Sequence, residues 1–163
     1  MMCLFAAIAI AGLLDGPAQQ SLPDIAVPPG YRSSVAAMLR YSPTFRRQCS
    51  RIASTPNLRV EILSSLLGGA ASAAALTRIV RSDRGIEATV QLGPSGDPVL
   101  LIAHEFEHIL EQLDGVDLPV MATRVATGVR VVPGSGHFET ERAIAAGRQV
   151  ADEVRRGRAR DGT

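Results

Sequence analysis

His104-Glu105-Phe106-Glu107-His108 is the stretch that decides how the middle of this chain folds. Residues four apart lie on the same face of an α-helix, so the two imidazoles can reach a single metal ion together. Glu105 projects about 100° around the helix from His104, which lets its carboxylate contact a water on that ion without binding the ion itself. We therefore predict His104 and His108 as metal ligands and Glu105 as the catalytic base.

The residues around this motif predict a long and largely buried helix. Asp97 suits the N-cap, Pro98 the first helical position and Gly115 the end. Apolar residues between them recur at intervals of three and four, as on the buried face of a helix: Val99, Leu100, Ile102, Ala103, Phe106, Ile109, Leu110 and Leu113. A buried imidazole pair needs polar partners, and a divalent cation would be one of them.

The size and composition of the chain limit what it can be. Its 163 residues are enough for one domain with a single hydrophobic core. A formal net charge of +1, 20% of charged residues and the lack of Trp argue against a nucleic-acid partner. Cys3 and Cys49 are the two cysteines, and if export removes Cys3, Cys49 has no partner within the chain for a disulfide.

Changes in composition divide the chain into four segments. Residues 1–14 form an apolar run that is too short to cross a bilayer and is typical of a secretory signal, with an N-terminal core helix as the alternative. We predict export to the periplasm or beyond the cell, with membrane contact only if this segment stays uncleaved. The predicted segments are a signal peptide at 1–18, a Pro-rich disordered lead-in at 19–30, a folded domain at 31–156 and a disordered basic tail at 157–163.

The patterns before the motif helix predict strands and two short helices. Apolar and polar residues alternate over 58–62 and 86–92, and the second of these forms a hairpin with 77–82. Helical patterns cover 33–41 and the residues from 43 onward. The Ala/Gly/Ser-rich segment 66–76 predicts a flexible connector, or else an Ala helix.

After the motif helix, residues 116–136 predict a connection that carries a short helix near 122–126, and 137–156 predict a last helix. The fold class that these patterns indicate is α+β. We expect a small antiparallel sheet or hairpin that packs on the motif helix, together with a C-terminal helix.

Catalytic zinc usually takes three protein ligands and leaves a fourth position for water, so the histidine pair needs a third partner. Asp114 follows the motif by six residues, but Glu111 continues the helix where a reversal of the chain would need glycine, and we reject Asp114. His137 lies beside two flexible glycines and could act as a ligand or stabilise an oxyanion. A solvated residue at the start of a helix explains His137 equally well.

Glu139 and Glu141 are the remaining candidates, and both are expected in the first turn of the last helix. The face of Glu139 continues with small or apolar residues, which would allow close packing on the motif helix: Ala143, Ala146, Gly147, Val150 and Val154. The face of Glu141 continues with Arg148 and Asp152, which indicates a solvated face. We favour Glu139 as the third ligand and keep Glu141 as the alternative, although either could simply be a favourable anion near a helix N-terminus.

In these features the chain resembles a minimal gluzincin, a member of the zinc peptidase group that includes the thermolysin-like enzymes. The resembling parts are HEFEH at 104–108, the strands just before it and FETERAIAAG at 138–147, which together cover about residues 77–150. The chain is also similar to small bacterial exported proteins of the same layout. The resemblance implies a zincin-like fold, Zn²⁺ as the metal and cleavage of a peptide or protein substrate by a zinc-activated water. In such a mechanism we expect the metal to steady the oxyanion, with His137 or Tyr41 as a candidate second donor.

Two positions depart from the gluzincin pattern. Glu107 is acidic where proteolytic members generally carry an uncharged residue, and Ala143 occupies a position where an Asp often orients a ligating histidine. Glu107 or Glu111 could take over that orienting role, or could simply face water. The alternative function is therefore a non-catalytic exported protein of the same fold that binds a metal or a protein partner.

Overall fold

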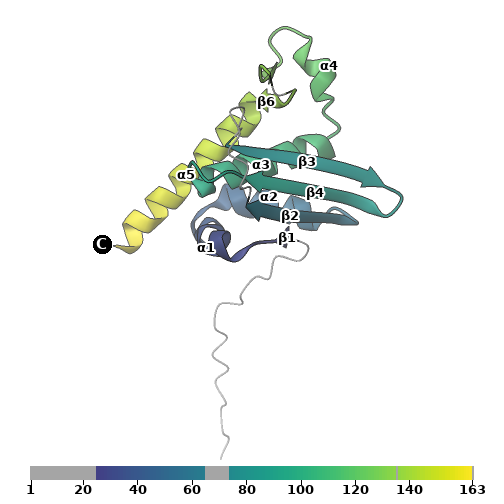
Figure 1. The fold of residues 1–163 in the computed structure, drawn as a ribbon. Coiled ribbons are helices and arrows are strands. Elements are labelled where there is room, and N and C mark those ends of the chain that lie inside the picture. The colour runs from purple at the N-terminus through teal and green to yellow at the C-terminus, as the bar shows by residue number, and fades with distance from the viewer. Residues whose placement is uncertain (1–24, 65–73, 135, 163) are drawn as a thin grey trace, which may run out of the picture.

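The computed structural model describes residues 25–64, 74–134 and 136–162 as a mixed α+β fold around one hydrophobic core. A four-stranded sheet, in the order β1-β2-β4-β3, forms one side of it (Figure 1). The strands are β1 (Ile25–Ala26), β2 (Leu58–Ser64), β3 (Ala75–Ser82) and β4 (Gly85–Leu92). β1 and β4 run parallel to β2, whereas β3 runs antiparallel to β4 and forms an edge of the sheet.

The described helices are α1 (Arg32–Tyr41), α2 (Pro43–Ala53), α3 (Pro98–Leu113), α4 (Leu118–Ala122) and α5 (Glu141–Asp161), with a 3-10 turn at Pro29–Tyr31. Four of these α-helices pack together beside the sheet, whereas α4 lies apart from it (Figure 1). The motif helix α3 is central, because it contacts β3 and β4 on one side and α2 and α5 on the other. Its predicted start is confirmed, since the side chain of Asp97 accepts a hydrogen bond from the backbone N–H of Val99 (2.9 Å) and Pro98 follows.

Alternating hydrophobicity explains the sheet. Leu58, Val60 and Ile62 of β2 are buried and point toward the helices, while the residues between them are exposed. β4 repeats the pattern with Ala88, Val90 and Leu92. The strands predicted from this alternation are therefore confirmed, but the sheet is mixed rather than antiparallel, because β1 and β4 flank β2 in parallel.

The folded domain extends further in both directions along the chain than the sequence predicts. Ile25–Ala26 pairs with β2 and Pro29–Tyr31 forms a turn of helix, so the predicted disordered lead-in is wrong for 25–30. At the other end, α5 continues to Asp161, and the predicted disordered tail is wrong for 157–161. The end of α5 contacts the end of α1, where the hydroxyl of Tyr41 donates a hydrogen bond to the carboxylate of Asp161.

The region after α3 also differs from the prediction. α4 covers Leu118–Ala122 rather than 122–126, and the last helix begins at Glu141 rather than at His137. Residues 138–140 form instead a short strand, β6 (Phe138–Thr140), which pairs antiparallel with β5 (Val129–Val131). The helix begins late because Thr140 has an extended backbone and caps it, accepting a hydrogen bond from the N–H of Ala143 (2.9 Å).

Several predictions fall at least partly on residues that the structure does not describe, among them residues 19–24 of the predicted lead-in and residue 163 of the predicted tail. The predicted signal peptide at 1–18 lies wholly outside the described residues, as does most of the predicted connector, at 66–73. The last residues of that connector, Ala75 and Leu76, belong to β3. Among the described helices, none combines the length and apolar character that crossing a bilayer requires.

Gly147 sets the distance between α3 and α5. A Cβ atom at this position would lie 2.9 Å from the carbonyl oxygen of Leu100 and 3.2 Å from the Cβ of His104. The backbone of α5 therefore touches α3 beside one of the two motif histidines, as the small residues on this face of the last helix predict.

Gly147→Ala should lower the free energy of unfolding by about 1–3 kcal/mol, because the added methyl group forces the two helices apart. This loss should appear even though Ala is the better helix former by about 1 kcal/mol. Chemical denaturation measures the change, with Arg148→Ala at the neighbouring exposed position as the control. A variant as stable as the parent would contradict the close contact.

Glu153 joins α5 to the start of α2. Its carboxylate accepts hydrogen bonds from the hydroxyls of Ser42 and Thr44, and Ser42 is the N-cap of α2. Partial burial alone would raise the pKa of Glu153, but the hydrogen bonds from Ser42, Gln149 and Thr44 lower it below its usual 4.5.

Because the folded pKa of Glu153 is lowered, its contribution to stability is complete above about pH 4.5 and is lost as the pH falls through the lower, folded value. We expect the stability difference between the parent and Glu153→Gln to be constant near neutral pH and to shrink in acid. Urea denaturation over a series of pH values measures it. A stability difference that grows as the pH falls would contradict the lowered pKa of Glu153.

Candidate metal centre

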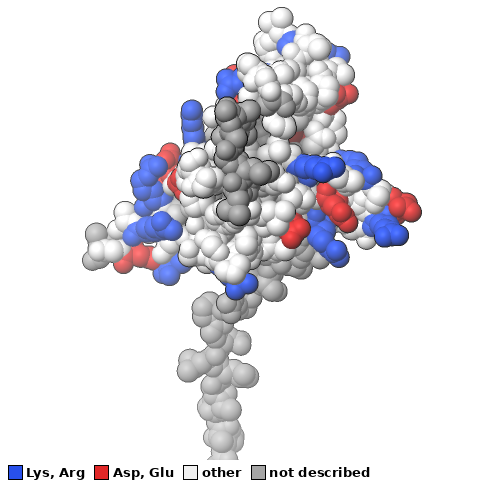
Figure 2. Space-filling view, in the orientation of Figure 1, with Lys and Arg blue, Asp and Glu red and all other residues white. Residues whose placement is uncertain are grey.

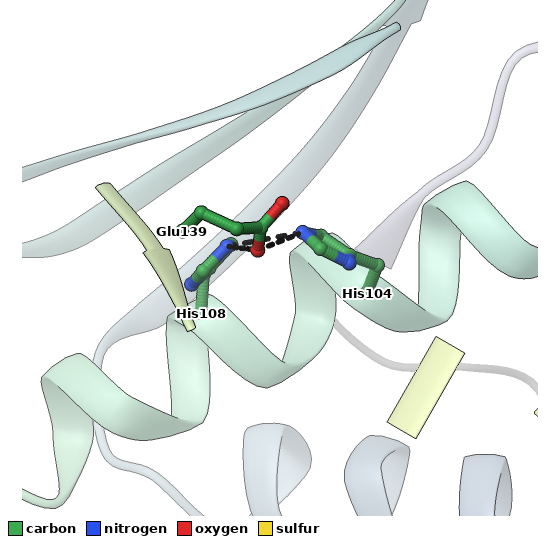
Figure 3. A group of neighbouring side chains, drawn as sticks. All are labelled: His104, His108 and Glu139. Carbon is green, nitrogen blue, oxygen red and sulfur yellow. Dashed lines mark hydrogen bonds and ion pairs between the residues drawn. The ribbon is translucent and has the colours of Figure 1, made fainter. Parts of the chain in front are cut away.

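His104 and His108 lie one turn apart on α3 and direct their imidazoles toward the same point (Figure 3). Their Nε2 atoms are 3.2 Å apart. Both side chains are mostly shielded from solvent, with 13% and 11% of their surface exposed. The geometry predicted from the four-residue spacing is therefore present in the fold.

Glu139 reaches the same point from β6. Its Oε1 atom lies 3.2 Å from Nε2 of His104 and 3.8 Å from Nε2 of His108. Donor atoms around a tetrahedral zinc ion lie about 3.4 Å apart, because each ligand bond is about 2.1 Å long. The three side chains thus fit one small cation. When the His, Cys, Asp and Glu side chains of the described residues are compared, these three form the group that could hold a metal ion.

The tautomer of His108 suits a ligand. Its Nδ1–H donates a hydrogen bond to Oε2 of Glu111 (2.9 Å), which leaves the lone pair of Nε2 directed at the shared point. The other oxygen of Glu111 accepts a hydrogen bond from the hydroxyl of Thr140 (2.7 Å). Glu111, which is only 3% exposed, therefore orients a histidine and also holds the residue next to Glu139.

The charges around the pair favour a cation. Burial alone would lower the pKa of His108, but the hydrogen bond to Glu111 and the carboxylates of Glu105 and Glu139 raise it above its usual value. Burial alone would raise the pKa of Glu139, but the hydrogen bond and the charge of His104 lower it. Three carboxylates thus stabilise positive charge at the imidazoles, whether a proton or a metal ion carries it.

Glu105 lies beside the three candidate ligands and is 4% exposed. Its burial raises the pKa of its carboxyl group, an effect that the hydroxyl of Thr77 and the two histidines partly oppose. A cavity of about 280 Å³ opens in front of it, and its lining includes both motif histidines, Glu105 and Glu139. The predicted base and the candidate ligands therefore share one accessible space.

Two segments form the walls of this cavity. β3 contributes Ala75, Leu76, Thr77 and Ile79, and the segment between α3 and α5 contributes Leu118, Val132 and residues 136–138. His137 is among these, half-buried, and lies on the same side of the β5–β6 hairpin as Glu139 because the two are separated by one residue. It lines the cavity, and it is not one of the three grouped side chains.

The other sequence candidates lie elsewhere. Glu141 is exposed, and Asp114 pairs with Arg51 and Arg142 (2.8 and 2.9 Å). Tyr41 is not among the residues that line the cavity, and its hydroxyl is bound to Asp161, so the suggestion that it steadies an oxyanion is wrong. Of the two glutamates weighed as third ligand, the fold brings only Glu139 to the histidines.

Glu107 is directed away from the histidine pair. Its carboxylate accepts hydrogen bonds from Nε2 of Gln48 (2.7 Å) and from Nε of Arg142 (2.6 Å). Its charge is therefore balanced by an arginine of α5, and it ties α3 to both α2 and α5. Of the two acidic residues suggested to orient a ligand, Glu111 has that contact and Glu107 does not.

Three residues that bind the carboxylates of α3 were not predicted from the sequence: Thr140, Gln48 and Arg142. Thr140 did have a local signal, because Thr is a preferred N-cap, and this would have moved the helix start to 141. Gln48 and Arg142 contact Glu107 across 59 and 35 positions of the chain, and no local pattern reports contacts of that range.

Comparison of the chain with models of known protein families, with curated proteins and with solved structures finds no match. The resemblance to gluzincins therefore stays a hypothesis that depends on the residues and their geometry.

Glu111→Gln should weaken zinc binding by about 10- to 100-fold, because the neutral amide no longer holds the Nδ1–H tautomer of His108. Competition with a chromophoric chelator measures the affinity. Glu107→Gln is the matched control, since it makes the same chemical change on the same helix at a site that contacts no candidate ligand. It should lower stability but leave zinc affinity intact, and equal losses of affinity in both variants would contradict the assigned contacts.

Proposed function

We propose that this protein is a zinc-dependent hydrolase that cleaves peptide bonds. The observation that carries the proposal is the meeting of three donor atoms, from α3 and β6, within 3.8 Å of one another at the edge of a cavity. Two histidines and one carboxylate are a common ligand set of catalytic zinc, which keeps one coordination position for water.

Zinc held by His104, His108 and Glu139 would supply a Lewis acid that polarises the attacking water and the substrate carbonyl. Glu105 would take a proton from that water and pass it to the leaving amine. The raised pKa of Glu105 suits this role, because a carboxylate that binds a proton more readily is the better base. His137 would donate a hydrogen bond to the substrate oxygen on which negative charge develops.

The edge of β3 offers a way to hold an extended peptide. Ala74 accepts a hydrogen bond from the N–H of Gly93 (2.9 Å), so this residue faces β4. Because main-chain groups alternate in an antiparallel pair, those of Ala75, Thr77 and Ile79 point away from β4. All three residues line the cavity, and no described strand pairs with them there, which favours a substrate bound as an added strand.

The two departures from the gluzincin pattern have physical counterparts in the fold. The acidic Glu107 is neutralised by Arg142 and faces away from the cavity, so it does not add negative charge where a substrate would lie. Glu111 orients His108, which is the kind of contact that an Asp at position 143 would be expected to make. Both observations favour catalysis over the non-catalytic alternative.

Glu105→Gln should leave bound zinc unchanged and lower kcat/KM for peptide cleavage by about 100- to 10,000-fold, because it removes the proton acceptor. Elemental analysis and a fluorogenic peptide library measure the two properties. Glu107→Gln, two residues along the same helix, is the control and should retain activity.

His104→Ala should lose both zinc and activity, because it removes a ligand. A parent protein that holds one zinc per chain and cleaves nothing in the library would refute the peptidase and favour the non-catalytic metal-binding alternative. Activity that survives in Glu105→Gln would refute the assigned base.

A further inference from the structure

Charge is divided unevenly between two halves of the fold. Helices α1, α2 and α5 carry two, three and six arginines. The carboxylates of these three helices number four, and all of them are in α5. The remaining described residues carry six arginines and ten carboxylates. The three helices contact one another, so a chain of formal net charge +1 presents one strongly basic side.

The excess is concentrated where α1 and α5 end. Arg155, Arg156, Arg158 and Arg160 are exposed and point to several sides of the last turns of α5. Gly157 takes the inner side, since a Cβ there would lie 2.5 Å from ring atoms of Tyr41.

Two further arginines come from the junction of α1 and α2. Arg40 lies over the ring of Tyr41, and Arg46 donates hydrogen bonds to the carbonyls of Leu39 and Arg40. The basic end is thus composed of Arg40, Arg46, Arg155, Arg156, Arg158 and Arg160.

Few carboxylates compensate this basic end. Asp161 pairs with Arg40 (2.6 Å) and Asp152 pairs with Arg155 (2.9 Å). Within the described part of the chain, neither Arg156 nor Arg158 has a carboxylate within ion-pair distance. Figure 2 shows several blue side chains on the side where α5 ends, with fewer red ones among them.

We propose that the basic end docks the protein on an anionic phospholipid bilayer. All 17 basic residues of the chain are arginines, and the planar guanidinium binds phosphate oxygens in pairs. The arginines surround a protruding helix end rather than line a groove, which suits a broad charged surface. The adjacent aromatic residue, Tyr41, is half-buried with its hydroxyl bound to Asp161, so it offers no platform for stacking bases, and this argues against nucleic acid.

Docking through this end leaves the candidate metal centre accessible. Glu139 directly precedes Thr140, the cap at the opposite end of α5, and a helix of 21 residues is about 30 Å long. The cavity beside β3 would therefore face away from the lipid surface. The docking proposal does not depend on catalysis at that cavity.

The test measures partitioning of the full chain onto vesicles of phosphatidylcholine, with and without phosphatidylglycerol. Any binding through the apolar residues 1–14 occurs on both kinds of vesicle, so the ratio of the two partition coefficients isolates the effect of charge. We expect anionic vesicles to bind about tenfold more tightly or better at low salt, since each arginine near the surface contributes to the attraction. Raising the salt should reduce this ratio.

Two triple variants with the same change of net charge locate the surface. Reversing Arg156, Arg158 and Arg160 to Glu should abolish the preference for anionic vesicles. Reversing Arg59 and Arg78, which are exposed on the sheet, together with Arg84 in the exposed turn between β3 and β4, should largely preserve it. Circular dichroism and zinc content verify that each variant is folded. If the reversal at 156, 158 and 160 unfolds the chain, the same residues changed to Gln replace it, with the same expected loss.

Three results would overturn the proposal. One is an equal preference for neutral and anionic vesicles by the parent chain. Another is an equal loss in the two sets of variants, which would indicate net charge alone. The third is tighter binding to duplex DNA or to single-stranded RNA than to anionic vesicles at the same salt concentration.

Discussion

The carboxylate of Glu111 makes the contact on which the geometry of the site depends. One of its oxygens accepts a hydrogen bond from His108 and the other accepts one from Thr140. These two partners belong to α3 and to the start of α5, which are separated by a long connection. Because Thr140 directly follows Glu139, the same carboxylate that orients a histidine also places the third donor. A buried carboxylate with both oxygens engaged is costly to displace, and this makes the arrangement rigid.

The extent to which the sequence predicts this arrangement depends on how local each signal is. The bounds of α3 follow from Asp97, Pro98 and the apolar periodicity, and the structure confirms them. Strands β2 and β4 follow from alternation over several residues. In contrast, β1, β5 and β6 have two or three residues each, too few for a period to appear, and only pairing with distant partners defines them.

The choice of Glu139 over Glu141 illustrates how a sound expectation can depend on a wrong intermediate step. The prediction placed both residues in the first turn of a helix and separated them by helical faces. In the structure Glu139 lies on a strand and Glu141 begins the helix, so the change from extended to helical backbone after Thr140 separates the two side chains. The small residues on α5 still have the expected role, since Gly147 brings this helix against α3.

Two polar partners of α3, Thr140 and Arg142, lie 29 and 35 positions beyond the carboxylates that they bind. Without Thr140 and Arg142, the buried carboxylates of Glu107 and Glu111 would each lose a hydrogen bond, so the burial of the motif helix is tied to the folding of a segment far beyond it in the chain.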